Sequence, residues 1–363
     1  MNSKNKIAIL GCGNGGMALS GYLAAKGYSV NIYESIKPSE DFLKFQKEKT
    51  IILDGDIKCS GLLNCITTDI REAFNEADNH ILVVVPAYAH EPVFEQMLPY
   101  IKDGQTIVIL PGNYGGLILR RMMAEHGIKK DVTICETSSL PFACRRTAYN
   151  VVTIYKQKAK LKMCTFPESR SKEALDALNK IMPIFIPAKN TLEVSLDNAN
   201  CVLHPFPLIL NYGTIEMNSK TFRHYIDGIT PEISNVIERV DQERMNIGKA
   251  YGVNLMPVLD QLKLFYGQND CTNIYDYVHS KDSPYFDIIG ENIRSRYITE
   301  DIPFLVVPAV QLAKKAGVAA PLFEASLKMA SLLHEVDYEK NGMSLKVLGI
   351  DSMSKEEIIA YLK

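Results

Sequence analysis

The sequence has 363 residues, and a single hydrophobic core rarely grows beyond about 250–300 residues, so the length predicts two domains. A hydrophobic fraction of 47% and a charged fraction of 23% exclude a disordered or fibrous chain. The formal net charge of −2 argues against a general nucleic-acid-binding protein, which usually carries a large basic excess.

Short β-branched runs alternate with helical stretches in the first half of the sequence, which is typical of a βαβ sheet. Each predicted strand is a nearly continuous apolar run, as expected when helices cover both faces of a doubly wound parallel sheet. The predicted strands are Lys6–Leu10, Ser29–Tyr33, Ile81–Val85, Thr106–Leu110 and Val132–Cys135, and the predicted helices are Gly16–Lys26, Glu91–Tyr100 and Gly116–His126.

The pattern changes twice in the second half. Strand-like sequence over 150–165, a helix near Lys172–Lys180 and a strand at Ile184–Pro187 complete the first unit. Helical periodicities then dominate, over Val202–Met217, Ile233–Tyr251, Leu255–Tyr266, Phe304–Ala316 and Pro321–Leu333. We predict an α/β domain over 1–188 and an all-α domain over 189–363, with a tight junction that favours a ligand cleft between them.

The eight cysteines form neither a C-x-x-C pair nor a Cys/His cluster with zinc-ligand spacing, so we expect no metal site. The first apolar run is too short for a signal peptide and ends at glycines. The longest apolar stretches fall far below the roughly 20 residues that span a bilayer. We therefore expect a cytoplasmic protein with reduced thiols and no membrane partner.

The segment Gly11-Cys12-Gly13-Asn14-Gly15-Gly16 fits G-x-G-x-x-G, follows the first strand and opens the first helix. Gly11 permits the tight turn, Gly13 lets a pyrophosphate approach the backbone, and Gly16 allows close packing of helix on strand. Asn14 and Gly15 belong to the same loop, whose free N–H groups and positive helix end suit a diphosphate. This context favours a Rossmann-type dinucleotide site over a purely structural glycine turn.

Glu34, at the end of the second strand, lies where a carboxylate binds the adenosine ribose hydroxyls. It favours NAD(H), because it would repel the 2′-phosphate of NADP(H). Lys37 nearby weakens that preference, so NADP(H) stays an alternative cofactor. The loops 85–90, which contains Pro86, and 111–116 also follow strands, and each either lines the nicotinamide side or is a plain Pro/Gly turn.

His204 stands out among the seven histidines because it follows Asn200 by four residues and precedes Pro205 and Pro207. On a helix Asn200 and His204 would share one face, and the prolines would end or kink that helix. This pattern alone fits a functional histidine and a satisfied core histidine equally well. A second polar cluster, 294–303, precedes an apolar helix, and Thr299, Glu300 and Asp301 would also serve as plain helix-start residues.

Together these motifs resemble the opine dehydrogenases, the octopine/nopaline dehydrogenase family, over nearly the full length. Position 142 departs from the family pattern, because it is Phe where the Leu-Pro-Tyr-Ala-Cys-Arg segment has Tyr, so a hydroxyl contact is lost there. The resemblance rests on the glycine fingerprint and on the segments 140–145, 200–205, 227–231, 241–244 and 296–303.

Members of this family reductively join the amino group of an amino acid to a 2-oxo acid, with NADH or NADPH as hydride source. The resemblance implies that His204 and Asp301 form a catalytic His–Asp dyad, that Arg296 binds a substrate carboxylate, and that Asn200 assists by hydrogen bonding. Asp301 would orient His204 and stabilise its charged form. The resemblance also implies NAD as cofactor and an amino acid and a 2-oxo acid as small-molecule partners, with a homodimer as a candidate assembly.

Tyr212, Tyr225 and Tyr285 are candidate lining residues of the amino-acid pocket, although most of the 18 tyrosines must be structural. Two other functions stay open. A 2-oxo or 2-hydroxy acid reductase of the same two-domain plan would turn over without an amine, and a non-catalytic dinucleotide-binding protein would not need the polar residues. The opine hypothesis requires that His204 and Asp301 lie within hydrogen-bond distance and face the glycine-loop cleft.

Overall fold

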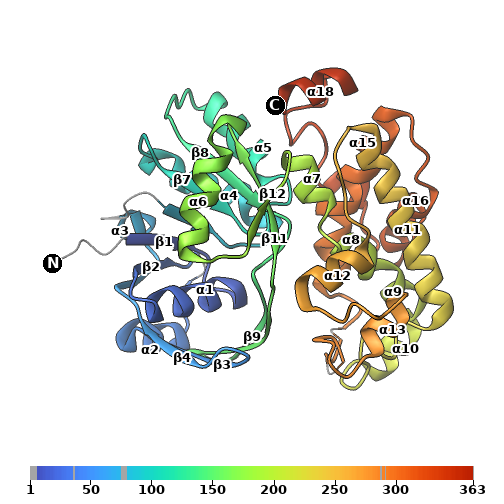
Figure 1. Ribbon diagram of the computed structural model, residues 1–363, viewed down its shortest axis with the longest axis horizontal. Coiled ribbons are helices and arrows are strands. Elements are labelled where there is room, and N and C mark those ends of the chain that lie inside the picture. The colour runs from blue at the N-terminus through green and yellow to red at the C-terminus, as the bar shows by residue number, and fades with distance from the viewer. Residues whose placement is uncertain (1–5, 36, 75–79, 287, 291, 363) are drawn as a thin grey trace. The chain divides into compact units, whose positions relative to one another are not determined.

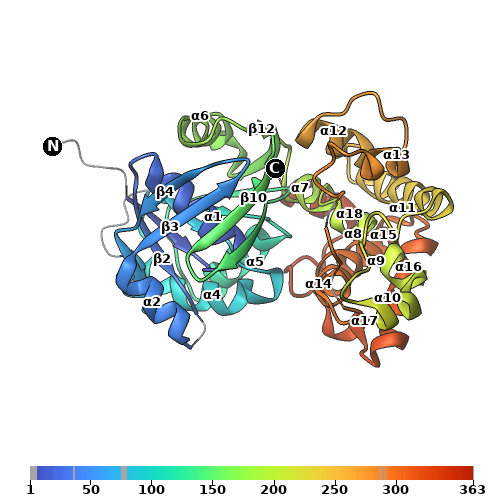
Figure 2. The same cartoon turned by 90° about the horizontal axis from the view of Figure 1, so that it is seen from below.

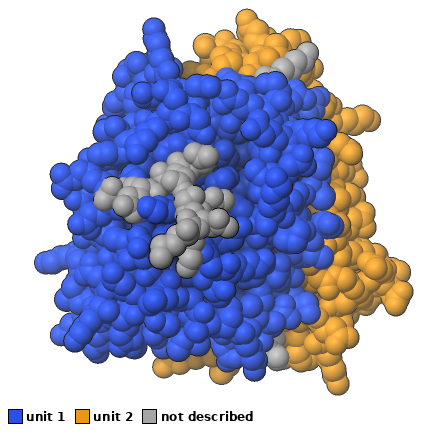
Figure 3. All heavy atoms as spheres, turned by 60° about the vertical axis from the view of Figure 1, so that its left-hand side comes forward, with its two compact units in different colours: residues 1–191 blue, residues 192–363 orange. Residues whose placement is uncertain are grey.

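The computed structural model describes residues 6–35, 37–74, 80–286, 288–290 and 292–362. The chain divides into two compact units, Met1–Thr191 and Leu192–Lys363, which Figure 3 colours separately. The first unit is built on an eight-stranded sheet with the order β12-β11-β8-β7-β6-β1-β2-β5. Its strands are β1 (Lys6–Leu10), β2 (Ser29–Tyr33), β5 (Cys65–Thr67), β6 (His80–Val83), β7 (Thr106–Ile109), β8 (Thr133–Thr137), β11 (Leu161–Phe166) and β12 (Phe185–Pro187).

The strand order reverses between β1 and β6, which are parallel neighbours. Right-handed crossovers therefore place the helix after β1 and the helices after β6 and β7 on opposite faces of the sheet. A doubly wound sheet binds ligands beyond the carboxyl ends of the strands at such a reversal. The helices of this unit are α1 (Asn14–Ala25), α2 (Glu40–Glu48), α3 (Ile70–Phe74), α4 (His90–Met97), α5 (Gly115–Glu125) and α6 (Ser171–Ile181) (Figure 1).

The α/β fold class is confirmed, but two features of the sheets differ from the sequence-based prediction. The strand β11 runs antiparallel to β8, with Met163 opposite Thr137, and is not parallel. A second sheet, β4-β3-β10-β9, covers α1 and was not predicted (Figure 2). After β8 the chain forms the β9–β10 hairpin before it returns, so β11 enters the main sheet from the opposite end. The strands of this sheet are β3 (Thr50–Gly55), β4 (Cys59–Leu62), β9 (Phe142–Ala148) and β10 (Val151–Gln157).

The second unit is helical, and α11, α15 and α16 pack against one another in it (Figure 1). The predicted helix over Val202–Met217 is broken into three: the first break, at His204, comes where Pro205 and Pro207 lack the N–H that would continue the helix, and the second falls at Asn211. Its helices are α7 (Thr191–Leu196), α8 (Asn200–Leu203), α9 (Pro205–Leu210), α10 (Tyr212–Asn218), α11 (Pro231–Ala250), α12 (Val258–Tyr266), α13 (Ile274–His279), α14 (Arg296–Thr299), the π-helical turn η4 (Ile302–Val306), α15 (Val307–Ala316), α16 (Pro321–His334), α17 (Tyr338–Asn341) and α18 (Lys355–Tyr361).

A fully buried arginine ties the long helix α11 to the segment that precedes α8. The Nε of Arg244 donates to Oδ1 of Asp241 at 2.7 Å, and its Nη1 donates to Oδ1 of Asp197 at 2.7 Å. The same Nη1 donates to the carbonyl of Leu196. A buried guanidinium is tolerated only when its charge and its donors are matched in this way. The network therefore fixes the start of the segment that carries His204.

We predict that Arg244→Met lowers the free energy of unfolding by about 3–5 kcal/mol, because two carboxylates are left without their buried cation. Denaturant-induced unfolding followed by far-UV circular dichroism measures the change. The control is Lys314→Met, which removes the exposed ion pair with Glu339 and should cost less than about 1 kcal/mol. Equal losses in the two variants would contradict the anchoring role of Arg244.

Candidate active site

The glycine fingerprint forms a tight loop between β1 and α1. Gly11 has φ +118°, and a Cβ there would lie 2.2 Å from the carbonyl oxygen of Val84. A Cβ on Gly16 would lie 1.9 Å from the carbonyl oxygen of Gly11, so helix and strand approach too closely for a side chain. A Cβ on Gly13 would meet nothing within 4 Å. Gly11 and Gly16 are therefore required by the fold, whereas Gly13 faces open space.

The N-terminus of α1 is free to receive an anion. Gly13 is its N-cap and offers no side chain, and the first turn of α1, all of it described, carries no acidic residue. The neighbouring loop residues are held from the side, since Asn14 Oδ1 accepts from the backbone N–H of Arg146 at 2.9 Å and Gly15 lies against Leu140. Exposed N–H groups at a bare helix start fit the diphosphate of a dinucleotide.

Glu34 lies next to this loop at the end of β2, half-buried, and its N–H donates to the carbonyl of Thr67. Burial and then the nearby Glu34 carboxylate raise the pKa of the Cys12 thiol to about 12. The carboxylate therefore lies near the glycine loop, where this fold places an acid that binds the ribose. Pro86 lies at the same edge of the sheet, half-buried, where it precedes the short turn Ala87–Ala89 after β6.

Glu136 is a buried acid at the end of β8 that the sequence analysis did not identify. It lies beneath the loop after β7: a Cβ on Gly112 or Gly116 would come within 2.7 or 2.2 Å of a carboxylate oxygen. Burial raises the pKa of Glu136 to about 7, although a hydrogen bond from the N–H of Gly116 opposes the shift. Glu136 thus holds the start of α5 from below.

Lys158 is a second buried ionisable group that sequence reasoning missed. Its Nζ donates to Oγ of Ser139 at 2.6 Å and to the carbonyl of Leu140 at 2.8 Å. Burial lowers the pKa of Lys158 to about 7. Since Leu140 contacts Gly15, this lysine fixes a loop that borders the glycine fingerprint.

The second unit holds the predicted dyad. His204 lies between α8 and α9, Asp301 lies between α14 and η4, and the two side chains are 6% and 5% exposed. The Nδ1 of His204 lies 2.6 Å from Oδ2 of Asp301, which confirms the predicted hydrogen bond across 97 residues of sequence. A carboxylate in this position orients the imidazole and favours its charged form. The pair has the geometry of an acid–base group.

Aromatic residues surround the dyad. The ring of His204 stacks on Tyr297 at 4.0 Å between centroids, and its Nε2 lies 2.9 Å from the hydroxyl of Tyr225. A second histidine, His224, lies edge-on at 5.6 Å. Burial, and then the proximity of His204, lower the pKa of His224 to about 3, so it stays neutral.

The other two predicted residues begin the short helices that precede the two dyad residues. Asn200 begins α8, and its carbonyl accepts from the backbone N–H of His204 at 3.1 Å, so the structure joins the two through the backbone. Arg296 begins α14 with a half-exposed side chain, whose Nε lies 3.6 Å from Oε2 of Glu300. Arg296 therefore lies half-exposed on the helix that leads to Asp301.

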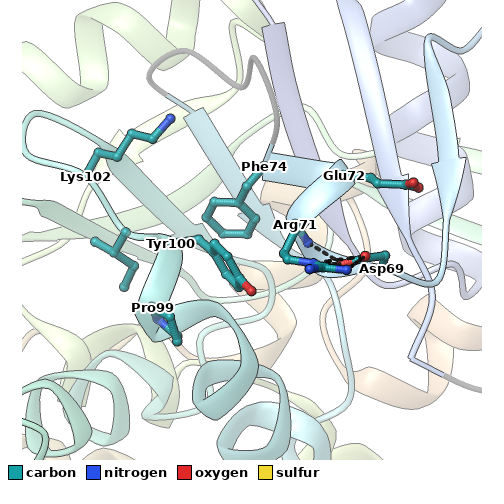
Figure 4. Close-up of a pocket in the computed structure, with 8 residues that line it drawn as sticks. Asp69, Arg71, Glu72, Phe74, Pro99, Tyr100 and Lys102 are labelled. Carbon is teal, nitrogen blue, oxygen red and sulfur yellow. Dashed lines mark hydrogen bonds and ion pairs between the residues drawn. The ribbon is translucent and has the colours of Figure 1, made fainter.

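A separate open pocket of about 620 Å³ lies at the surface of the first unit (Figure 4). Arg71 in its lining forms an ion pair with Asp69, and the rings of Phe74 and Tyr100 lie side by side. None of the predicted site residues lines it. Within the described ranges, no cluster of His, Cys, Asp or Glu could hold a metal ion, and no helix is both long and apolar enough to cross a membrane.

A bare glycine loop on a doubly wound sheet, joined to a helical unit with a buried His–Asp pair, defines a two-domain NAD(P)-dependent dehydrogenase. Residues 187–334 match the family described as NAD/NADP octopine/nopaline dehydrogenase, alpha-helical domain. Residues 6–130 match the N-terminus of NAD-dependent glycerol-3-phosphate dehydrogenase.

The chain is 35% identical to the opine dehydrogenase of Arthrobacter sp. (strain 1C) over 98% of both chains. It belongs to the opine dehydrogenase family. Octopine dehydrogenase solved with NADH and L-arginine has the same fold, with a TM-score of 0.78 at 22% identity over 99% of this chain and 98% of that one. The complex of octopine dehydrogenase with NADH and pyruvate has a TM-score of 0.75 over the same shares.

We predict a pH dependence of stability from Glu136. Its pKa is raised from 4.5 to about 7 in the folded protein, so the folded state binds the proton more tightly, and stability is lost as pH rises through this window. In Glu136→Gln, which keeps the acceptor for Gly116, this loss should be absent. Between pH 5 and pH 8, the free energy of unfolding of the wild type should therefore fall relative to that of the variant by up to about 3 kcal/mol.

Denaturant unfolding of both proteins at the two pH values measures this difference. The exposed acid Glu232, in the first turn of α11, supplies the control, and Glu232→Gln should follow the wild-type pH dependence. Parallel curves for wild type and Glu136→Gln would contradict the prediction.

Proposed function

We propose that the protein catalyses the NAD(P)H-dependent condensation of an amino acid with a 2-oxo acid, and the reverse oxidation. The observation that carries this proposal is the buried hydrogen bond between His204 and Asp301, in a chain of the opine dehydrogenase family. A reductive condensation needs one group that moves protons while hydride moves to carbon.

In this proposal His204 is the acid–base group and Asp301 holds its orientation. In the reducing direction His204 supplies the proton that lets the carbinolamine oxygen leave as water. In the oxidising direction it accepts the proton of the secondary amine. Asp301 accepts from Nδ1 throughout, which leaves Nε2 as the nitrogen that exchanges protons. Asn200, one turn before His204, assists by hydrogen bonding.

Arg296 is proposed as the group that binds the carboxylate of the 2-oxo acid. A guanidinium can hold a carboxylate through two parallel hydrogen bonds, which fixes the orientation of the reacting carbon. Its half-exposed side chain lies at the start of α14, the helix that directly precedes Asp301.

The cofactor is proposed to bind at Gly11, Gly13, Asn14, Gly15 and Gly16, with Glu34 on the adenosine ribose and Pro86 at the adjoining strand end. The bare helix start and the open space at Gly13 fit a diphosphate. When bound, NADH supplies the hydride. Glu34 favours NADH over NADPH, and titration of the protein with both measures the preference. The small-molecule partners are then one amino acid and one 2-oxo acid, and we further propose that the protein is cytoplasmic.

The test is NADH oxidation with a matrix of amino acids and 2-oxo acids, each with and without the amine. We expect oxidation that depends on both partners. His204→Ala should lower kcat by about 10²–10⁴-fold on the best pair, because the acid–base group is lost. His126→Ala, at an exposed helix end, is the control and should keep wild-type kcat. Turnover that is independent of any amine would instead show a 2-oxo acid reductase.

We predict that Arg296→Lys raises KM for the 2-oxo acid by about tenfold or more, with a smaller change in kcat. Lysine keeps the charge but cannot form the two parallel bonds. Arg294→Lys is the matched control, because Arg294 donates to the carbonyl of His334 and points to a different partner. Steady-state kinetics with the 2-oxo acid as varied substrate decide the result. An unchanged KM would remove Arg296 from the carboxylate site.

A further inference from the structure

Both ring nitrogens of His204 are engaged. Nδ1 faces Asp301, and Nε2 lies 2.9 Å from the hydroxyl oxygen of Tyr225. An ionised carboxylate only accepts hydrogen bonds, so we assign the proton to Nδ1, and Nε2 of the neutral ring then accepts from the Tyr225 hydroxyl. A substrate that exchanges a proton at Nε2 must displace this hydroxyl or pass the proton through it.

The packing of Tyr225 opposes displacement. The residue is 4% exposed, and its ring lies 4.4 Å from the ring of Tyr285 and 4.9 Å from that of His224, measured between centroids. Protein interiors are close-packed, so moving this ring out of its place would leave a void and break these contacts. The fixed ring keeps the hydroxyl on Nε2.

The hydroxyl of Tyr225 is also in a protonation state that can pass a proton from His204 to a substrate. Burial and the neighbouring hydroxyls of Tyr297, Tyr285 and Tyr266 raise the pKa of Tyr225 well above its usual value. The phenol is therefore neutral, and a neutral hydroxyl donates one proton while it accepts another. Tyr297, which stacks on His204, directly follows the proposed carboxylate binder Arg296 along α14.

We propose that the hydroxyl of Tyr225 is a proton relay between Nε2 of His204 and the substrate. This inference rests on the proposed function. In the reducing direction, the Nε2–H bond of the imidazolium breaks and its proton forms a new O–H bond on Tyr225. The original phenol proton bonds to the carbinolamine oxygen, whose C–O bond breaks with its electron pair to release water. His204 ends neutral and Tyr225 ends as it began.

The first test is Tyr225→Phe, assayed on the pair of substrates that the wild type uses fastest. The relay predicts that kcat falls by about 10²-fold or more, with little change in either KM. If the substrate instead displaces the hydroxyl from Nε2, the variant should be as fast as the wild type or faster, because removal of the hydroxyl frees Nε2. An unchanged or higher kcat therefore overturns the relay. The matched control is Tyr251→Phe, which loses a buried hydroxyl bonded to the carbonyl of Leu312, away from His204, and should keep kcat.

A second test separates proton transfer from packing. Tyr225→Ala removes the ring, and added phenol should restore part of the rate, whereas toluene, which has the same shape without the hydroxyl, should not. Equal effects of the two compounds overturn the relay. If neither variant folds, the wild type decides: two protons in flight give a curved dependence of kcat on the deuterium content of the solvent, and a linear dependence overturns the relay.

Failure of the proposed function is visible separately, in the wild type. If wild-type NADH oxidation does not depend on an amine, the condensation is wrong. The ratio of kcat for Tyr225→Phe to kcat for the wild type, measured on the carbonyl reduction that remains, still tests the relay. A ratio near one overturns it with any substrate.

Discussion

The organisation of the helical unit depends on one buried interaction between a carboxylate and an imidazole. Removing Asp301 from water is costly unless its charge is matched, and the Nδ1–H of His204 supplies that match. The pairing joins the α8–α9 junction to the α14–η4 junction, and both junctions are places where proline interrupts a helix. Pro205 and Pro303 free the backbone from regular helix and let the two side chains meet. The π-helical turn after Asp301 is a feature often found at functional sites.

The net charge of −2 gives no global field that would attract anions, yet the proposed cofactor and substrates are anionic. Capture therefore depends on local groups in each unit. In the first unit the N-terminus of α1 supplies backbone N–H groups and the positive end of the helix dipole, and no side chain caps it. In the second, we propose that Arg296, whose side chain is half-exposed beside Glu300, binds the substrate carboxylate. Local devices of this kind act at short range and are compatible with a near-neutral protein.

Much of the fold could be predicted, because buried parallel strands are continuous apolar runs and β1 and β2 match their predicted bounds. The antiparallel β11 and the small sheet could not, because the partner with which a strand pairs is set by tertiary contacts rather than by the strand's own sequence. The dyad was found through motifs on two distant segments. Glu136 and Lys158 were missed, since a single acid or lysine has no spacing signal. Tyr225 was a candidate lining residue, but its hydrogen bond to His204 is a property of the folded chain.

The aromatic surroundings of the dyad also bear on the chemistry that we propose. An imine formed from an amine and a 2-oxo acid is readily hydrolysed, so its reduction requires that water be kept from the reacting carbon. Tyr225, Tyr297 and His224 cover His204 with rings that are almost fully buried, and His224 stays neutral, which adds no second charge. A water-filled site would need only the acid–base pair. The protein instead buries the His204–Asp301 pair among phenols that exclude bulk water, and in the proposed relay Tyr225 carries the proton that the proposed condensation requires.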